Sequence, residues 1–308
     1  MEAFNNTKKP AAWLYSAAIL LSGSLWGTMG LFRRGMGDLG LSTTGVILLR
    51  CGLAALCFGL TILLTGRAQF RVRWKDLWCF LGSGVVSLLF FTLCYFQAMT
   101  LMSLSTAAIL LYTAPCFVIL MSALLFHDRV TGRILLAMLL AFAGCCLVSG
   151  IMGGGSRLSL IGILYGLGSG IGYALYTIFG KLAMQRNYGS LTINFYSCLF
   201  AALGASLISV FNGDGFLRQV TLACGSGGSL LFCVAAGLVT CYFPYLLYTW
   251  GLTGTQSGKA SIMASVEPVV ATLVGMIAYR EYPDLWAVLG IALVLAAIVL
   301  TNLESKKA

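Results

Sequence analysis

Residues 102–126 read MSLSTAAILLYTAPCFVILMSALLF and contain no charged side chain. A helix needs about 20 consecutive apolar residues to cross the roughly 30 Å hydrocarbon core of a bilayer, so this run predicts a membrane-spanning helix. Pro115, near its middle, has no N–H to offer the carbonyl of Leu111, which is left without a helical partner. The stretch therefore predicts a span with a weak point built into it.

The rest of the chain has the same character. Of its 308 residues, 59% are hydrophobic and 9% are charged, whereas soluble domains carry about 25% charged residues. This composition excludes a soluble globule and predicts an all-α integral membrane protein with ten transmembrane helices. The runs of spanning length cover residues 12–32, 43–64, 76–98, 102–126, 133–150, 160–180, 191–211, 229–250, 257–279 and 285–302. They leave no room for a separate soluble domain.

The ten runs fall into two groups of five on either side of the flexible stretch Gly153-Gly154-Gly155-Ser156. We expect a first five-helix repeat and a second one, joined by a linker and flanked by short cytoplasmic tails. The corresponding ranges are 1–11 for the N-terminal tail, 12–150 for the first repeat, 151–159 for the linker, 160–302 for the second repeat and 303–308 for the C-terminal tail.

A shift of 153 residues superposes part of the first group on the second without a gap. It places Gly84 on Gly237, Phe90 on Phe243, Tyr95 on Tyr248, Thr100 on Thr253, Ala107 on Ala260, Ile109 on Ile262, Pro115 on Pro268 and Asp128 on Glu281. Shared proline, tyrosine and acidic positions indicate a duplication. Because each copy has an odd number of spans, the copies must have opposite orientations in the membrane, as in many secondary transporters.

The distribution of Lys and Arg predicts the orientation of the chain. Loops on the side of the termini hold twelve of these residues, and the opposite loops hold five, namely Arg33, Arg34, Arg157, Arg218 and Arg280. Positive residues near span ends are retained in the cytoplasm. We therefore expect both termini to be cytoplasmic in an inner or plasma membrane.

Four motifs resemble a known family. The stretch from Gly258 to Gly275, followed by Glu281, is similar to the second-repeat signature of the EamA-type transporters of the drug/metabolite transporter superfamily. Ser24-Leu-Trp-Gly27, Tyr112-Thr-Ala-Pro115 and Tyr173-Ala-Leu-Tyr176 also resemble the patterns of this family. The resemblance implies ten helices in two inverted repeats and the movement of a small metabolite or drug, commonly outward. His127-Asp128-Arg129 departs from the usual Gly-Glu-Arg.

Glu267 is the only carboxylate well inside a predicted span. A charge at this depth costs about 2.5 to 3.5 kcal/mol, so the side chain should face the interior of the bundle. In one interpretation it binds a proton or the amine of a substrate, and in the other it is tied to Arg50. Lys259 either extends to the inner surface or meets an anionic group of the solute. These alternatives remain open at this point.

Two further features predict how a solute is held and moved. Pro115 and Pro268 are matched weak points, which favours a gating role over static kinks. Many aromatic side chains fall inside spans, where a buried tyrosine hydroxyl needs a partner. The predicted substrate-binding residues are Trp26, Tyr95, Gln97, Tyr112, Tyr176, Tyr245, Tyr248 and Ser265. Such a lining suits an amino acid, an aromatic metabolite or a drug-like solute, unless the rings only fill the core.

The sequence favours a secondary exporter that works by alternating access. The alternatives are an exchanger of anionic metabolites that uses Arg50 and Lys259, and a passive channel. Catalysis is not expected, because a nucleophile with its base and a set of metal ligands are both missing. We expect no metal or cofactor, and no nucleic-acid partner despite the net charge of +10. The expected partners are the lipid bilayer and a small-molecule substrate. Whether a proton is a third partner stays open at this point.

Overall fold

The computed structural model describes residues 10–102, 104–148, 159–213, 215–280 and 282–303. These residues form helices and turns and contain no strand, as the composition predicts. The linker and both tails expected from the sequence lie almost entirely outside the described residues, as does Glu281.

Within the described residues, the first five spans contain eight α-helices and one π-helical segment. They are α1 (Ala12–Gly27) and α2 (Met29–Asp38) in span one, α3 (Thr43–Thr65) in span two, α4 (Leu77–Leu81), the π-helical segment η3 (Gly82–Leu89) and α5 (Phe90–Leu101) in span three, α6 (Leu104–Leu111) and α7 (Ala114–Phe126) in span four, and α8 (Gly132–Val148) in span five.

The second five spans repeat this plan. They are α9 (Leu160–Gln185) in span six, α10 (Ser190–Phe211) in span seven, α12 (Gly227–Gly237), the π-helical segment η5 (Leu238–Tyr242) and α13 (Phe243–Leu252) in span eight, α14 (Ser257–Ala264) and α15 (Glu267–Tyr279) in span nine, and α16 (Leu285–Leu303) in span ten. A short amphipathic helix, α11 (Phe216–Cys224), connects spans seven and eight.

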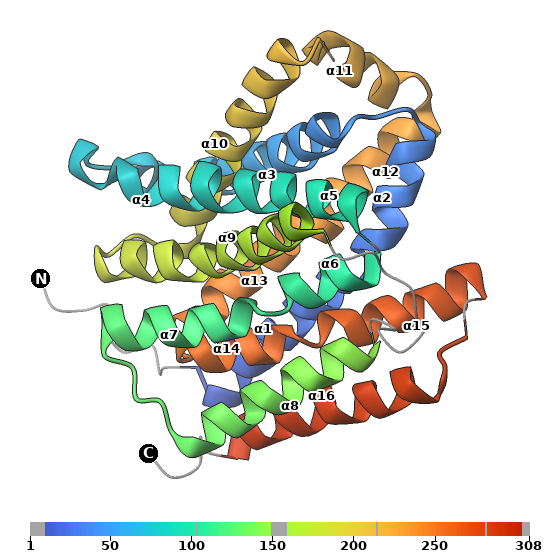
Figure 1. Cartoon of the computed structure of the whole chain (residues 1–308). Coiled ribbons are helices and arrows are strands. Elements are labelled where there is room, and N and C mark those ends of the chain that lie inside the picture. Colours follow the sequence, from blue (N-terminus) through green and yellow to red (C-terminus); the bar gives the residue numbers. More distant parts are fainter. Residues whose placement is uncertain (1–9, 103, 149–158, 214, 281, 304–308) are drawn as a thin grey trace, which may run out of the picture.

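The spans confirm the predicted fold class. Nine segments of the described chain are long and apolar enough to cross a membrane, and α8 is the shorter tenth. Figure 1 shows the spans running between two faces of the molecule, with the start of α1 and the end of α16 on the same side. We call this side the terminal face and the opposite side, where α11 lies, the far face.

Two helices extend well past their predicted ends: α9 reaches Gln185 instead of residue 180, so Lys181 lies in the helix, and span one extends further still. The first span was expected to end at residue 32, with Arg33 and Arg34 in an outer loop, but α2 continues as a helix to Asp38. The hydrophobic run ends earlier than the helix because one face of α2, which carries Arg33, lines the interior cavity rather than facing lipid. Two arginines therefore belong to the bundle and not to a connection.

The inverted repeat is visible in matched irregularities. Spans four and nine are both interrupted just before their prolines, so that Pro115 and Pro268 lie in the first turns of α7 and α15. Spans three and eight both contain π-helical segments, and the shift of 153 residues superposes η5 on the second half of η3. Wider turns of this kind are rare and occur often at functional sites. The sequence analysis did not anticipate them.

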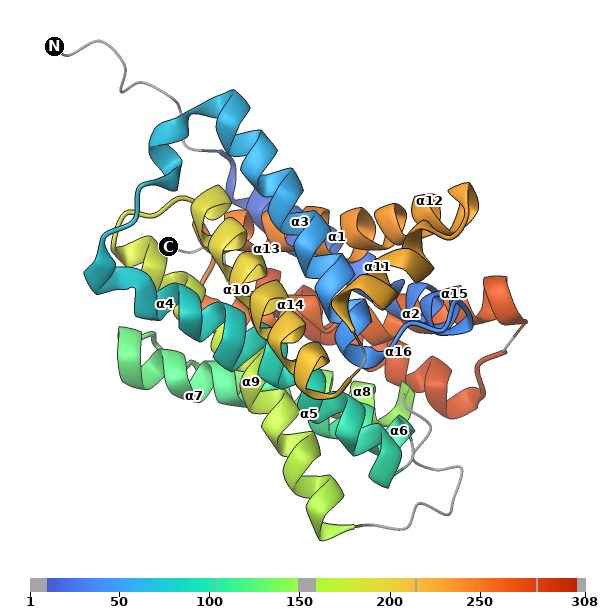
Figure 2. The same cartoon turned by 90° about the horizontal axis from the view of Figure 1, so that it is seen from above.

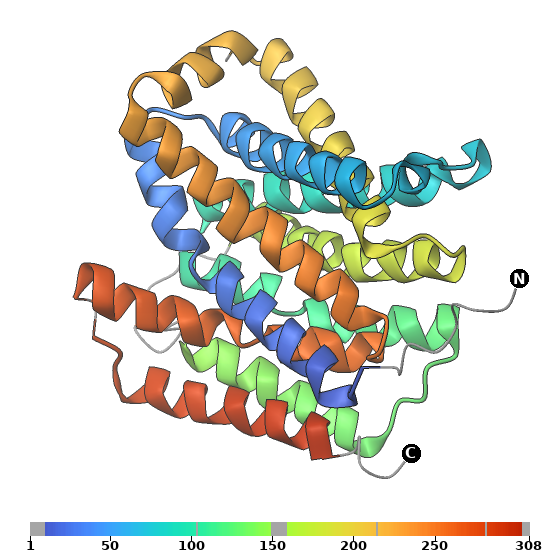
Figure 3. The same ribbon diagram turned by 180° about the vertical axis from the view of Figure 1, so that it is seen from behind.

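The interrupted span of each repeat packs against the first span of the other repeat. A side chain added at Gly23 of α1 would lie 2.9 Å from the carbonyl oxygen of Ala264, and one at Gly170 of α9 would lie 2.9 Å from that of Leu110. Figure 3 shows the blue first span lying between span eight and span nine. The first span of each repeat thus covers the interrupted span of its partner, because glycine lets the two backbones approach closely.

Two further pairs of spans complete the bundle. Helices α3 and α10 lie side by side in Figure 2, and α8 lies along α16 at the bottom of Figure 1. In the second pair a Cβ at Gly144 would lie 2.7 Å from the Gly290 oxygen, and one at Gly290 would lie 2.6 Å from the Gly144 oxygen. This reciprocal contact holds spans five and ten together.

We predict that Gly144→Ala lowers the free energy of unfolding by about 1–3 kcal/mol, because the added methyl group has to push two backbones apart. Gly132→Ala in the same helix is the matched control, since nothing lies within 4 Å of a Cβ there. The control should be neutral or slightly stabilising. Unfolding in detergent followed by circular dichroism measures both, and equal effects would contradict the close contact.

Candidate functional site

A cavity of about 520 Å³ lies between the two repeats. Its walls come from α1 and α2, α3, α5, α6, α8, α13 and α15. The exposed residues of its lining are Gly30 and Arg34 of α2 and Ala271 and Tyr279 of α15, and both helices run to the far face. The cavity therefore opens toward the far face and narrows toward the middle of the bundle.

Five buried or half-buried rings close the cavity on its inner side. They belong to Trp26, Tyr173, Tyr176, Tyr245 and Tyr248, and we call them the aromatic floor. The Trp26 ring lies 5.2 Å from that of Tyr245 and 5.4 Å from that of Tyr248. The void left among these rings has a volume of only about 10 Å³, which is room for about one water molecule. Solute cannot pass this floor.

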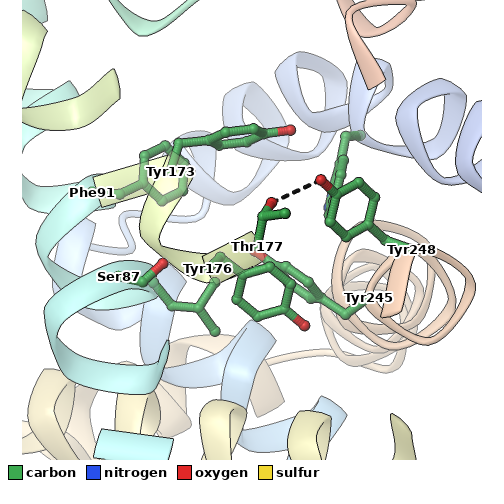
Figure 4. Close-up of a pocket in the computed structure, with 9 residues that line it drawn as sticks. Ser87, Phe91, Tyr173, Tyr176, Thr177, Tyr245 and Tyr248 are labelled. Carbon is green, nitrogen blue, oxygen red and sulfur yellow. Dashed lines mark hydrogen bonds between the residues drawn. The ribbon is translucent and has the colours of Figure 1, made fainter. Parts of the chain in front are cut away.

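The hydroxyl groups of Tyr176 and Tyr248 in the floor have partners within the protein. Tyr176 donates to Asn194 Oδ1 at 2.6 Å, and Asn194 Nδ2 donates to the carbonyl oxygen of Tyr245 at 3.1 Å. The hydroxyls of Thr177 and Tyr248 lie 2.8 Å apart, as the dashed line in Figure 4 shows. The floor is therefore a closed hydrogen-bonded layer between α9, α10 and α13.

Asn194 is a functional candidate that the sequence analysis missed. It is fully buried in α10 and links the Tyr176 hydroxyl to the backbone carbonyl of Tyr245. A signal was present, because a polar amide inside an apolar span is costly and usually functional.

Ion pairs reinforce the closure on the terminal face. Asp128, just after span four, forms an ion pair with Lys181 of α9, with 3.1 Å between Nζ and Oδ2. Asp76, just before α4, forms an ion pair with Arg186, with 3.2 Å between Oδ1 and Nε. It also accepts a hydrogen bond from the Tyr188 hydroxyl at 2.7 Å. These pairs are largely shielded from solvent and join the first repeat to the second where the cavity is shut.

Arg50 is held on the wall of the cavity by span eight. Its Nε donates to the Thr240 hydroxyl at 2.7 Å and its Nη2 donates to the Thr240 carbonyl at 2.9 Å. Pro244, four residues later, has no N–H for that carbonyl. The guanidinium group supplies a donor to that carbonyl, so the partner of Arg50 is Thr240 and not Glu267, which the sequence left open as an alternative.

Glu267 lies on another wall of the same cavity, at the first residue of α15. A carboxylate is favoured there, because the N–H groups of a helix start carry partial positive charge. Its charge acts on Tyr95, Tyr112 and Tyr173. Among the described residues, no hydrogen bond or ion pair ends on this carboxylate.

The residues predicted from the sequence divide into three groups by their position: in the cavity lining, in the floor, or outside both. Trp26, Tyr95, Tyr112, Tyr245, Arg50, Glu267 and Pro268 line the cavity, and Tyr176 and Tyr248 lie beneath it in the floor. Gln97 is exposed, Ser265 is buried at the break of span nine, and Lys259 lies in the first turn of α14, and these three are not among the described lining residues. Pro115 lies at the break of span four, outside the lining.

Known proteins share this architecture along nearly the whole chain. A model described as the EamA-like transporter family matches residues 13–150 and 160–303. The chain belongs to this family.

Individual relatives of this EamA protein agree with the family. An uncharacterized transporter of Archaeoglobus fulgidus is 32% identical over 285 residues, covering 92% of this chain and 94% of that protein. The uncharacterized transporter YxxF of Bacillus subtilis is 24% identical and covers 92% and 88%. One crystal structure matches with a TM-score of 0.80 at 18% identity over 95% of this chain and 98% of that chain, which shows the fold alone.

The family, the names of the relatives and the apolar helices together establish the class of this EamA protein. It is a multi-pass membrane transporter and not an enzyme. The cavity between its repeats is the candidate substrate site.

We predict that Asn194→Leu lowers the free energy of unfolding by about 1–3 kcal/mol, because the Tyr176 hydroxyl loses its buried acceptor. Asn212→Leu at the exposed end of the same helix is the matched control. Denaturant unfolding in detergent compares the two variants. Equal stability of both would show that the amide does not hold the floor together.

Proposed function

We propose that this protein is a secondary transporter that moves a small amphipathic solute through the central cavity by alternating access. The observation that carries the proposal is a cavity between inverted repeats that is open to one face and closed to the other by the aromatic floor. Its aromatic and aliphatic lining suits the apolar body of such a solute.

Equivalent residues support the existence of a second state. Tyr95 lines the open cavity, whereas its repeat partner Tyr248 is 1% exposed and lies in the floor. In a state open to the terminal face, the two tyrosines exchange these environments. The breaks at Pro115 and Pro268 are the points at which spans four and nine bend during the exchange.

The proposed direction and orientation follow from the charge distribution of the loops. We place both termini in the cytoplasm of a cell membrane, so that the described state is open to the outside. The transporter then acts as an exporter that collects solute in the cytoplasm-facing state. A proton is the proposed coupling ion, with Glu267 as its carrier, because this carboxylate faces the cavity without a protein partner among the described residues.

Glu267→Gln tests the coupling. The solute is the compound that most raises the melting temperature of purified protein in a screen of amino acids, amines, purines and sugars. In proteoliposomes the wild type should show saturable counterflow and pH-driven accumulation. The variant should keep counterflow and lose the accumulation, because an amide does not take up a proton.

Asp284→Asn is the matched control, since this carboxylate lies before α16, away from the cavity. It should retain both activities. Flux of the wild type that never saturates would contradict alternating access and favour the passive channel. Accumulation that persists in Glu267→Gln would exclude Glu267 as the proton carrier while leaving transport intact.

A natural thiol tests the orientation. Cys224 is exposed at the end of α11 on the far face. A membrane-impermeant maleimide should therefore label the wild type in intact cells. Cys51→Ala and Cys241→Ala remove the two thiols that line the cavity. In this background Cys224→Ser should abolish the labelling, since the remaining thiols lie in spans. Labelling of Cys224 only after the cells are opened would reverse the proposed topology.

A further inference from the structure

We propose that Arg33 and Arg50 form a binding site for the carboxylate group of the transported solute. This inference rests on the proposed function and narrows the solute to an amphipathic organic anion, zwitterions included. Both arginines line the cavity, one from α2 and one from α3. The sequence analysis placed Arg33 in a loop and paired Arg50 with Lys259 for anions, whereas Lys259 is not among the described residues that line the cavity.

The first arginine is available to a ligand. The guanidinium carbon of Arg33 lies 3.5 Å from the centre of the Phe96 ring. Such stacking uses the face of the guanidinium group and leaves its in-plane N–H donors unused. Arg33 Nε is buried and has no hydrogen-bond partner among the described residues. A buried donor without a partner is unfavourable, and a carboxylate that closes on this group would remove the deficit.

The second arginine is already oriented. Thr240 occupies Nε and one Nη2 donor of Arg50. A guanidinium group has five N–H donors, and none of the other three is used by a described residue. Because the side chain is fixed before the solute arrives, little conformational entropy is lost on binding. Arg50 therefore offers a rigid fork that matches the two oxygens of a carboxylate.

The charges of the cavity favour an anion at this place. The positive charges of Arg33 and Arg50 repel each other, and an anion between them relieves the repulsion. Glu267 lines the same cavity from α15, and both Glu267 and Arg33 act electrostatically on Tyr95. The cavity thus carries two cationic groups, on α2 and α3, and one carboxylate, on α15.

The rest of the lining accommodates an apolar body. Phe91, Met99, Leu88 and Ala271 line the same space as the two arginines. A solute with a carboxylate and an aromatic or aliphatic body satisfies both parts of the cavity. A positively charged amine with the same body meets repulsion at the arginines.

The test uses three probes that share one body, namely 3-phenylpropanoate, phenethylamine and 3-phenylpropanamide. Purified full-length protein is titrated with each probe, and the melting temperature reports binding without requiring transport. Only the carboxylate should raise the melting temperature at low millimolar concentration. The increase should fall as salt is added, because the attraction is partly screened.

Arg33→Gln should weaken the binding of 3-phenylpropanoate by about tenfold or more, the effect of losing a charge-assisted hydrogen bond. Arg50→Lys keeps the charge but removes the fork, and it should weaken binding as well while preserving a donor for Thr240. Arg218→Gln is the matched control, since this exposed arginine of α11 lies outside the cavity lining. It should bind the probe like the wild type.

Three results would overturn the anion site: no increase in melting temperature with 3-phenylpropanoate, an equal increase with phenethylamine, or unchanged affinity in both cavity variants. Saturable counterflow of another solute alongside any of these results would leave the proposed transport function standing. Conversely, binding that depends on Arg33 without any flux of the probe in proteoliposomes would support the anion site and contradict transport.

Discussion

The fold depends on one constraint, that backbone N–H and carbonyl groups inside a bilayer must find partners within the protein. Spans four and nine violate helical continuity at Pro115 and Pro268, so their freed groups have to be shielded from lipid. The glycine faces of α9 and α1 provide this shield, each for the opposite repeat. The interrupted spans therefore lie at the seam of the molecule, which is also the place where the cavity forms.

The same constraint explains the position of Arg50. Its guanidinium group partners the Thr240 carbonyl at the π-helical segment of span eight, next to Pro244. An arginine at this depth is costly on its own, but a fixed pair of hydrogen bonds offsets part of the cost and aims the remaining donors at the cavity. Backbone irregularity and site chemistry are thus parts of one arrangement.

The sequence was sufficient for the architecture and for part of the site. The length of the apolar runs, the odd number of spans in each repeat and the matched prolines predicted the bundle and its breaks. Both features depend on local composition and symmetry. The contacts of the site were harder to predict. Gln97 follows the cavity-lining Phe96 along the helix but points outward, and the buried role of Asn194 depends on three helices meeting. Arg33 was misassigned because a hydropathy pattern cannot distinguish a charged residue in a loop from one in a helix that lines an internal cavity.

Symmetry and chemistry are divided between the two repeats. Pro115 and Pro268 are equivalent, and so are Tyr95 and Tyr248, which allows the halves to exchange shapes. The charged residues break the equivalence, because the repeat partner of Glu267 is Ala114, a buried residue packed against α9. A carboxylate in only one copy gives the cavity a single acidic residue together with the arginines, instead of a symmetric pair of carboxylates. In the proposed mechanism, the duplication supplies the motion, and departures from it supply selectivity for the solute.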